Sequence, residues 1–297
     1  MKIRKILKQY LQNIVNWLLY SNLYIGICAM AFTYQGYYLL HLAPQLNLVI
    51  VLSGVATMFV YLLIRVVATK RINEYAPEDR WDFFKRNLRA MQVLTVVSLI
   101  ACIILYFLVP TNVQLILLIP GIISVMYGIP IRFKKGVFRL RDIGISKIFM
   151  ISFVWGFIGS FLPGSVSGLD VYSEAIYILF IANFLFTFAI TIPFDIKDLQ
   201  IDAQHHVKTI PAIIGKEKSY ILAFTALLLS GIFHIYLQNN YLQEVNYSIP
   251  IALSILISAG CIYLTKVKTN NLMFFGILDG MLILQAVLIV CWNTISR

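Results

Sequence analysis

The chain has 297 residues, of which 60% are hydrophobic and only 12% are charged, and its mean hydropathy is +0.83. A soluble domain carries about twice that share of charge, so the composition excludes an ordinary soluble protein. It predicts an all-α, polytopic membrane protein, since helices are the default where lipid offers backbone groups no partner. The net charge of +11 does not indicate nucleic acid, because basic residues in membrane proteins gather in loops and report orientation.

The first residues predict a helix that lies along the membrane surface. The stretch "KIRKILKQYLQNIVNWLLY" repeats apolar residues at helical intervals and places its basic residues largely on another face. We expect residues 1–12 to form an interfacial amphipathic helix on the inner leaflet, as an anchor rather than a substrate gate. No small-residue cleavage site follows the basic residues, so we expect the segment to be retained.

Nine apolar segments follow in chain order, and most approach the roughly 20 residues that a membrane-spanning helix needs. The fourth is short and ends at "YGIP", so we expect a tilted or broken helix there. No repeat or linker divides the chain, which predicts one transmembrane domain over residues 1–297. The expected spans are 13–34, 46–68, 88–109, 112–128, 147–164, 174–194, 218–237, 248–265 and 271–292.

The loops between these segments alternate in charge. Lysine and arginine occur in the N-terminal stretch and in every second loop, whereas residues 35–45, 110–111, 165–173 and 238–247 contain neither. Because basic loops stay on the inner side, this alternation predicts a cytoplasmic N-terminus and an external C-terminus, in a cell inner membrane. It also supports an odd number of spans.

Three carboxylates directly follow the sixth apolar segment, in the stretch "DIKDLQID". Asp195, Asp198 and Asp202 are spaced i, i+3 and i+7, which places them on one face of a helix. Like charges there repel, and aspartate at a helix C-terminus opposes the helix dipole. Open carboxylate geometry suits Mg²⁺ that shares its shell with phosphate oxygens. We therefore predict a catalytic metal site, the alternative being a solvated helix end with ordinary surface acids.

Two stretches carry a family resemblance. "DIKDLQIDAQHHVKTIPAIIG" resembles the second aspartate-rich motif of the UbiA superfamily of intramembrane prenyltransferases, with His206 where that family usually has glycine. "YGIPIRFKKGVFRLRDIGISKIFMISFVWG" resembles the family's Tyr-Ser-x-Pro-x-x-x-Lys segment and the Trp-Gly that follows it. The match covers about residues 120–220.

The resemblance implies a fold, a reaction and a set of site residues. The fold would be a helical bundle around a central apolar chamber. The reaction would be Mg²⁺-dependent transfer of an isoprenyl group from a prenyl diphosphate to a small lipophilic or aromatic acceptor within the membrane. Asp195, Asp198 and Asp202 would hold the metal, while Tyr127, Arg132, Lys134 and Lys208 would bind the diphosphate.

The family's first aspartate-rich motif is missing from its expected place. After the second apolar segment the chain reads "VYLLIRVVATKRINEYAPEDRWDFFKRN", and the helix end carries Arg65 instead of a carboxylate. We hypothesise that Arg65 binds the diphosphate directly and replaces part of the missing metal's charge. Alternatively, Arg65 extends to the interface or pairs with Asp195. Glu78, Asp79 and Asp82 are out of register, and we expect them in a solvated loop.

Three functions remain open from the sequence. The first is the prenyltransferase, the second a terpene cyclase or other diphosphate-processing enzyme on the same fold, and the third a non-catalytic lipid-binding or transport protein. An acid inside the last segment, Asp279, either orients an acceptor or belongs to a packing network with Gln285.

Overall fold

The computed structural model describes residues 2–69, 79–128, 131–133, 136–138, 143–204, 207–241 and 245–296. Over these residues the protein is helical, apart from two three-residue strands that pair antiparallel. The elements are α1 (Lys2–Tyr20), α2 (Leu23–Leu39), α3 (Leu48–Ala68), α4 (Asp79–Arg86), α5 (Leu88–Leu108), α6 (Thr111–Gly128), β1 (Ile131–Phe133), β2 (Gly136–Phe138), α7 (Ser146–Val166), α8 (Glu174–Lys197), α9 (Leu199–Gln204), α10 (Ile210–Ile214), α11 (Lys216–Tyr241), α12 (Ser248–Leu264), the π-helix η3 (Leu272–Leu278) and α13 (Met281–Ile295).

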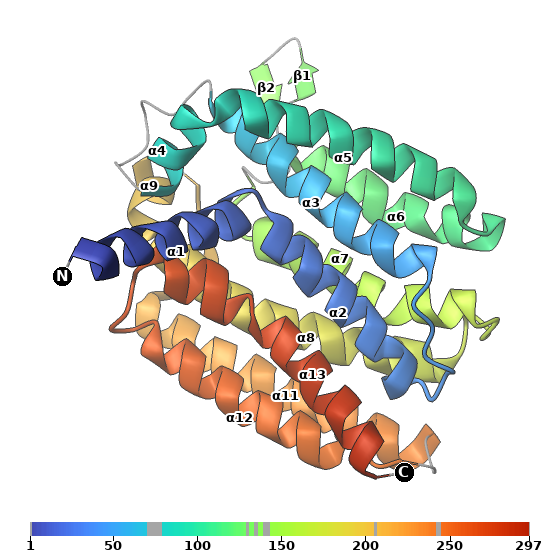
Figure 1. Cartoon of the computed structure of the whole chain (residues 1–297). Helices are drawn as coiled ribbons and strands as arrows, with labels where there is room; N and C mark the ends of the chain where they lie inside the picture. Colours follow the sequence, from blue (N-terminus) through green and yellow to red (C-terminus); the bar gives the residue numbers. More distant parts are fainter. Residues whose placement is uncertain are drawn as a thin grey trace.

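The long helices form one bundle (Figure 1). The short elements α4, α9 and the β1–β2 pair lie near one end, on the side of the N-terminus, and the C-terminus lies at the opposite end. Helix α8 is central: 61% of its most apolar window is buried, against 17% for α5, whose apolar residues face outward. The bundle therefore has a tightly packed core and an apolar outer surface, as an integral membrane protein requires.

The helices of the structure correspond to the nine predicted apolar segments, although two of them are not regular full-length spans. Seven helices within the described ranges are long and apolar enough to cross a membrane, namely α3, α5, α6, α7, α8, α11 and the combined η3–α13. The bent pair α1–α2 supplies an eighth span, and α12 is a shorter apolar helix of 17 residues. The predicted nine segments thus correspond to seven regular spans, one bent span and one short helix.

The first predicted segment is not a single helix. Helix α1 runs on to Tyr20, beyond the expected boundary at residue 12, and α2 begins at Leu23 with a bend of 59° between the two. The bend falls at Asn22, whose φ of 62° is left-handed, a conformation that ends a helix and that asparagine tolerates. Leu7, Tyr10 and Leu11 are exposed in the first half of α1, whereas Trp17 in its second half packs on Phe83. The interfacial position remains a prediction.

Small residues and polar pairs hold the helices together. A Cβ atom on Gly26 of α2 would lie 2.9 Å from the carbonyl oxygen of Gly54, so this pair lets α2 and α3 approach closely. Gln35 donates to Gln285 across 3.1 Å, and Gln285 donates to Ser254 across 3.3 Å, which joins α2, α13 and α12. Hydrogen bonds of this kind fix helix neighbours where lipid and protein are equally apolar.

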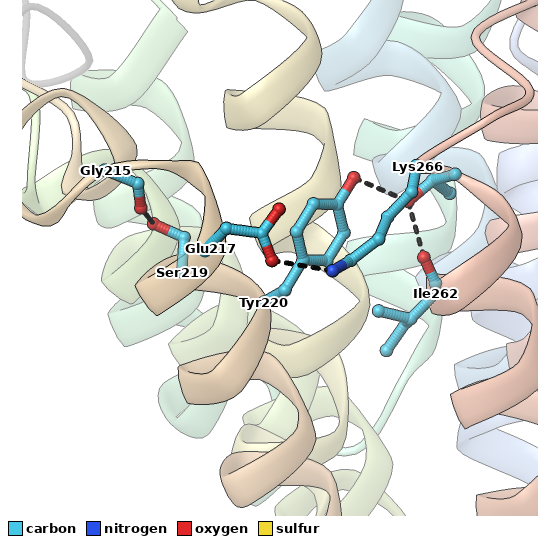
Figure 2. A network of polar contacts seen from close by, with 7 residues as sticks. Gly215, Glu217, Ser219, Tyr220, Ile262 and Lys266 are labelled. Atoms are coloured by element: carbon cyan, nitrogen blue, oxygen red, sulfur yellow. Dashed lines mark hydrogen bonds and ion pairs between the residues drawn. The ribbon is translucent and has the colours of Figure 1, made fainter.

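A polar network fastens α11 to the end of α12 (Figure 2). Lys266 donates to Glu217 at 2.8 Å, and the hydroxyl groups of Tyr220 and Thr265 lie 3.2 Å apart. The hydrogen bond that Lys266 donates to the Glu217 carboxylate raises the pKa of Lys266. The chain enters α11 at Gly215, whose φ of 83° favours glycine. This network follows the aspartate stretch in the chain and positions the helix after it.

Candidate functional site

The bundle encloses a cavity of about 450 Å³. Its walls come from α2, α3, α6, α7, α8 and the η3–α13 segment, and apolar or aromatic side chains such as Ile25, Val60, Ile151, Trp155 and Leu282 form much of them. Apart from Asp279, the charged lining residues come from the helix ends near α4 and α9. The cavity therefore has an apolar interior and a charged mouth.

The three predicted aspartates all line this cavity. They do not lie on one continuous helix as expected, because α8 ends at Lys197 and Asp198 caps it with φ −84° and ψ 1°. Asp202 belongs to α9, and its amide donates to the carbonyl of Asp198 at 2.9 Å. The break between α8 and α9 changes the direction of the chain, but all three carboxylates still lie at the cavity mouth.

A lysine that the sequence reading did not single out lies between two of these carboxylates. The Lys147 ammonium is 2.7 Å from an Asp195 oxygen and 3.9 Å from an Asp202 oxygen. Asp198 and the Tyr127 hydroxyl also lie within electrostatic range of it. A weak sequence signal existed, since Lys147 stands in the first turn of α7, where a cation opposes the helix dipole.

The donor chemistry of this cluster fits magnesium. Mg²⁺ is held by one or two carboxylates and completes its shell with water and phosphate oxygens. Asp195 and Asp202 already share one cation, the Lys147 ammonium, so their oxygens converge on a common point. Within the described residues no group of three or more His, Cys, Asp or Glu side chains is close enough to hold a metal without other ligands. A metal here would therefore need oxygens from a bound molecule.

Two arginines also line the cavity. Arg65, at the end of α3, is only 9% exposed, lines the cavity and donates to the Tyr20 carbonyl oxygen at 3.1 Å. Its guanidinium lies 5.6 Å from the ring centroid of Phe275, and the guanidinium of Arg80 lies 4.8 Å from the same ring. Arg65 thus points inward rather than out to the interface. Arg80 was not predicted, because its loop reads as solvated.

That loop contains a helix, which corrects the sequence reading. Asp82 lies in α4 and is exposed, in agreement with a solvated acid, and Trp81 of the same helix is buried. The Asp79 side chain and all of Glu78 lie outside the described residues. The apolar contacts of Trp81 and Phe84 explain why the segment folds onto the bundle.

The remaining predicted residues divide into two groups. Tyr127, at the end of α6, lines the cavity, whereas Lys208 is exposed and is not among the lining residues. The backbone of Lys208 packs directly on Gly144, which leaves no room for a Cβ there. Arg132 belongs to β1, but its side chain lies outside the described residues, as does Lys134 altogether.

Asp279 also lines the cavity, deeper than the aspartate cluster by its position after η3. The predicted network with Gln285 does not form, since Gln285 bonds to Gln35 and Ser254 instead. The amide of Asp279 donates to Phe274 at 3.1 Å, a π-helical bond that shifts the register of the last span. Sequence periodicity assumes 3.6 residues per turn and so misplaces such a side chain.

Comparison with known proteins identifies the family. Residues 85–278, more than half of the chain, match the UbiA prenyltransferase family, and the chain belongs to that family. No curated protein matches the sequence at a significant level.

Solved structures share the whole fold at low sequence identity. The structure of a UbiA homologue from Archaeoglobus fulgidus bound to GPP and Mg²⁺ is 14% identical, with a TM-score of 0.65 over 93% of this chain and 99% of that one. The apo structure of a UbiA homologue from Aeropyrum pernix K1 is 15% identical, with a TM-score of 0.64 over 91% and 97%. A digeranylgeranylglyceryl phosphate synthase structure is also 15% identical, with a TM-score of 0.58 over 95% and 98%.

Proposed function

We propose that this protein is an intramembrane, Mg²⁺-dependent prenyltransferase that moves an isoprenyl group from a prenyl diphosphate to a small lipophilic or aromatic acceptor. The observation that carries the proposal is the cavity, whose lining combines Asp195, Asp198, Asp202 and Arg65 with apolar and aromatic side chains. A prenyl diphosphate has the same two halves, a polyanionic head and an apolar tail. The solved homologue with GPP and Mg²⁺ supports this choice of ligand.

Two kinds of positive charge would neutralise the diphosphate: Mg²⁺ held by the carboxylates, and the arginine side chains. Asp195, Asp198 and Asp202 would hold Mg²⁺, which neutralises the leaving group when bound. Arg65 and Arg80, which line the same cavity near Phe275, would contribute positive charge from the segment where the first aspartate-rich motif is missing. Tyr127, which lines the same cavity, would donate a hydrogen bond to the head group.

Transfer begins when the allylic C–O bond breaks and its electron pair leaves with the diphosphate. The allylic carbon then bonds to a nucleophilic atom of the acceptor, which loses a proton. The apolar walls exclude water from the carbocation, and the aromatic faces of Tyr24, Tyr61 and Trp155 favour positive charge. Asp279 also lines the cavity and would orient the acceptor.

We also propose one transmembrane domain over residues 1–297, with α1 as an interfacial anchor and its basic end in the cytoplasm. The termini lie at opposite ends of the bundle (Figure 1), in agreement with an odd number of crossings. Labelling of a Ser296→Cys variant by a membrane-impermeant maleimide in intact cells tests this orientation, and labelling only after permeabilisation would reverse it.

Release of pyrophosphate from C10 to C20 prenyl diphosphates tests the proposed function. We expect the purified protein to release it with Mg²⁺ and not with EDTA, and to transfer the prenyl group when an acceptor is present. Asp198→Asn should lower the rate by about a hundredfold, within the range for loss of an electrostatic stabiliser. A cyclised hydrocarbon without acceptor would identify a cyclase, and no release from any chain length would support a non-catalytic lipid-binding protein.

A further inference from the structure

The position of Lys147 has a consequence for how the metal binds. We propose that its ammonium is a built-in counter-ion of the aspartate cluster, which excludes a divalent metal until the diphosphate arrives. The inference rests on the proposed function, because it concerns the same carboxylates. It makes metal and diphosphate bind together rather than one after the other.

The geometry places the ammonium where a metal would share the carboxylates. It contacts Asp195 at 2.7 Å and reaches Asp202 at 3.9 Å, so one positive charge already bridges α8 and α9. The Asp195 side chain is fully buried and the Lys147 side chain is only 13% exposed. At such sites a nearby unit charge interacts more strongly than in water, so a second cation is disfavoured.

The helix position of Lys147 indicates that the carboxylates hold it there. It is the second residue of α7, and a cation near a helix N-terminus is disfavoured by the dipole. The compensation comes from Asp195 and Asp202, both on other helices. Binding a diphosphate supplies new anionic oxygens for the ammonium, which releases the carboxylates to a metal that arrives with those oxygens.

A simpler explanation makes Lys147 a structural clamp between α7 and α8. The two explanations predict different changes in metal affinity when the lysine is removed. A clamp predicts that removing the lysine lowers stability and leaves metal affinity unchanged or weaker. A competing counter-ion predicts that removing the lysine strengthens metal binding to the protein without substrate.

Mn²⁺ binding to the full-length protein in detergent, followed by electron paramagnetic resonance without diphosphate, separates these readings. We expect Lys147→Met to bind Mn²⁺ at least about tenfold more tightly than the unmodified protein, because a unit positive charge leaves the site. Lys147→Arg keeps the charge and should bind Mn²⁺ as the unmodified protein does. Lys266→Met removes a cation paired with Glu217 outside the cavity and should also leave Mn²⁺ affinity unchanged.

A second measurement covers the case in which Lys147→Met is too unstable to handle without metal. Asp195 would then be buried without its counter-ion, and a metal that replaces the lysine should restore stability. We expect Mg²⁺ to raise the unfolding temperature of Lys147→Met more than that of the unmodified protein. The same rise in both proteins, or equal Mn²⁺ affinities, would overturn the inference.

The outcomes also separate this inference from the proposed function. If pyrophosphate release requires Mg²⁺ but Lys147→Met binds Mn²⁺ no more tightly, the proposed function is supported and the counter-ion inference is wrong. If no prenyl diphosphate is cleaved but Lys147→Met gains Mn²⁺ affinity, the counter-ion inference is supported and the proposed function is wrong.

Discussion

At the scale of single residues, the site is a balance of charges around one cavity mouth. The carboxylates were predictable from "DIKDLQID", because their spacing is local and like charges so close in the chain need a cation nearby. Lys147 and Arg80 were not predictable, because their contacts join segments far apart in the chain. Arg65 was predicted as a site residue because it stands where the family's first aspartate-rich motif is expected, and it does line the cavity.

Arg65→Ala tests the role of that arginine. A charge-assisted hydrogen bond is worth roughly 1.5–3 kcal/mol, so we expect KM for the prenyl diphosphate to rise about ten- to a hundredfold. The Mg²⁺ requirement should also become steeper, because the metal would carry more of the neutralisation. Steady-state kinetics over a series of Mg²⁺ concentrations measures both effects.

Two variants control that experiment. Arg65→Lys keeps the charge and should retain part of the affinity, and Lys85→Ala removes an exposed cation of α4 and should change neither quantity. If Arg65→Ala leaves diphosphate affinity and metal dependence as they were, the arginine is structural and holds only the Tyr20 carbonyl.

At the scale of elements, apolar runs predicted the helices well and their irregularities poorly. Spans such as α3 and α5 match the expected ranges within two residues, because length and hydropathy suffice for a lipid-facing helix. The bend at Asn22 was missed, since one left-handed residue leaves the apolar run intact. The π-helix before α13 was missed for the same reason.

Gln285→Ala tests whether buried polar pairs, rather than apolar area alone, fix helix neighbours. The change removes the partner of Gln35 and of Ser254, and interhelical hydrogen bonds in membranes are worth about 0.6–2 kcal/mol each. We expect a lower unfolding temperature in detergent, with diphosphate affinity retained. Gln9→Ala, at an exposed position of α1, should not lower it. Equal unfolding temperatures for all three proteins would assign the stability to packing alone.

At the scale of the whole molecule, the bundle separates two environments that the reaction needs. The charged mouth lies toward the end that carries the short elements and the N-terminus, and the interior is apolar. The alternation of basic loops predicts which end of the bundle faces the cytoplasm, because it depends on the position of each loop and not on its conformation. The cavity itself required the fold, since its lining residues come from helices along the whole chain, from α1 to α13.

The central claim is that Asp195, Asp198 and Asp202 hold a divalent metal on a prenyl diphosphate. A structure with Mn²⁺ and geranyl thiolodiphosphate, phased on the anomalous scattering of manganese, tests it most directly. We expect a manganese peak about 2 Å from carboxylate oxygens of this cluster and from phosphate oxygens, as in magnesium sites. Diphosphate bound elsewhere, or a cluster without manganese in an enzyme that still turns over, would contradict the claim.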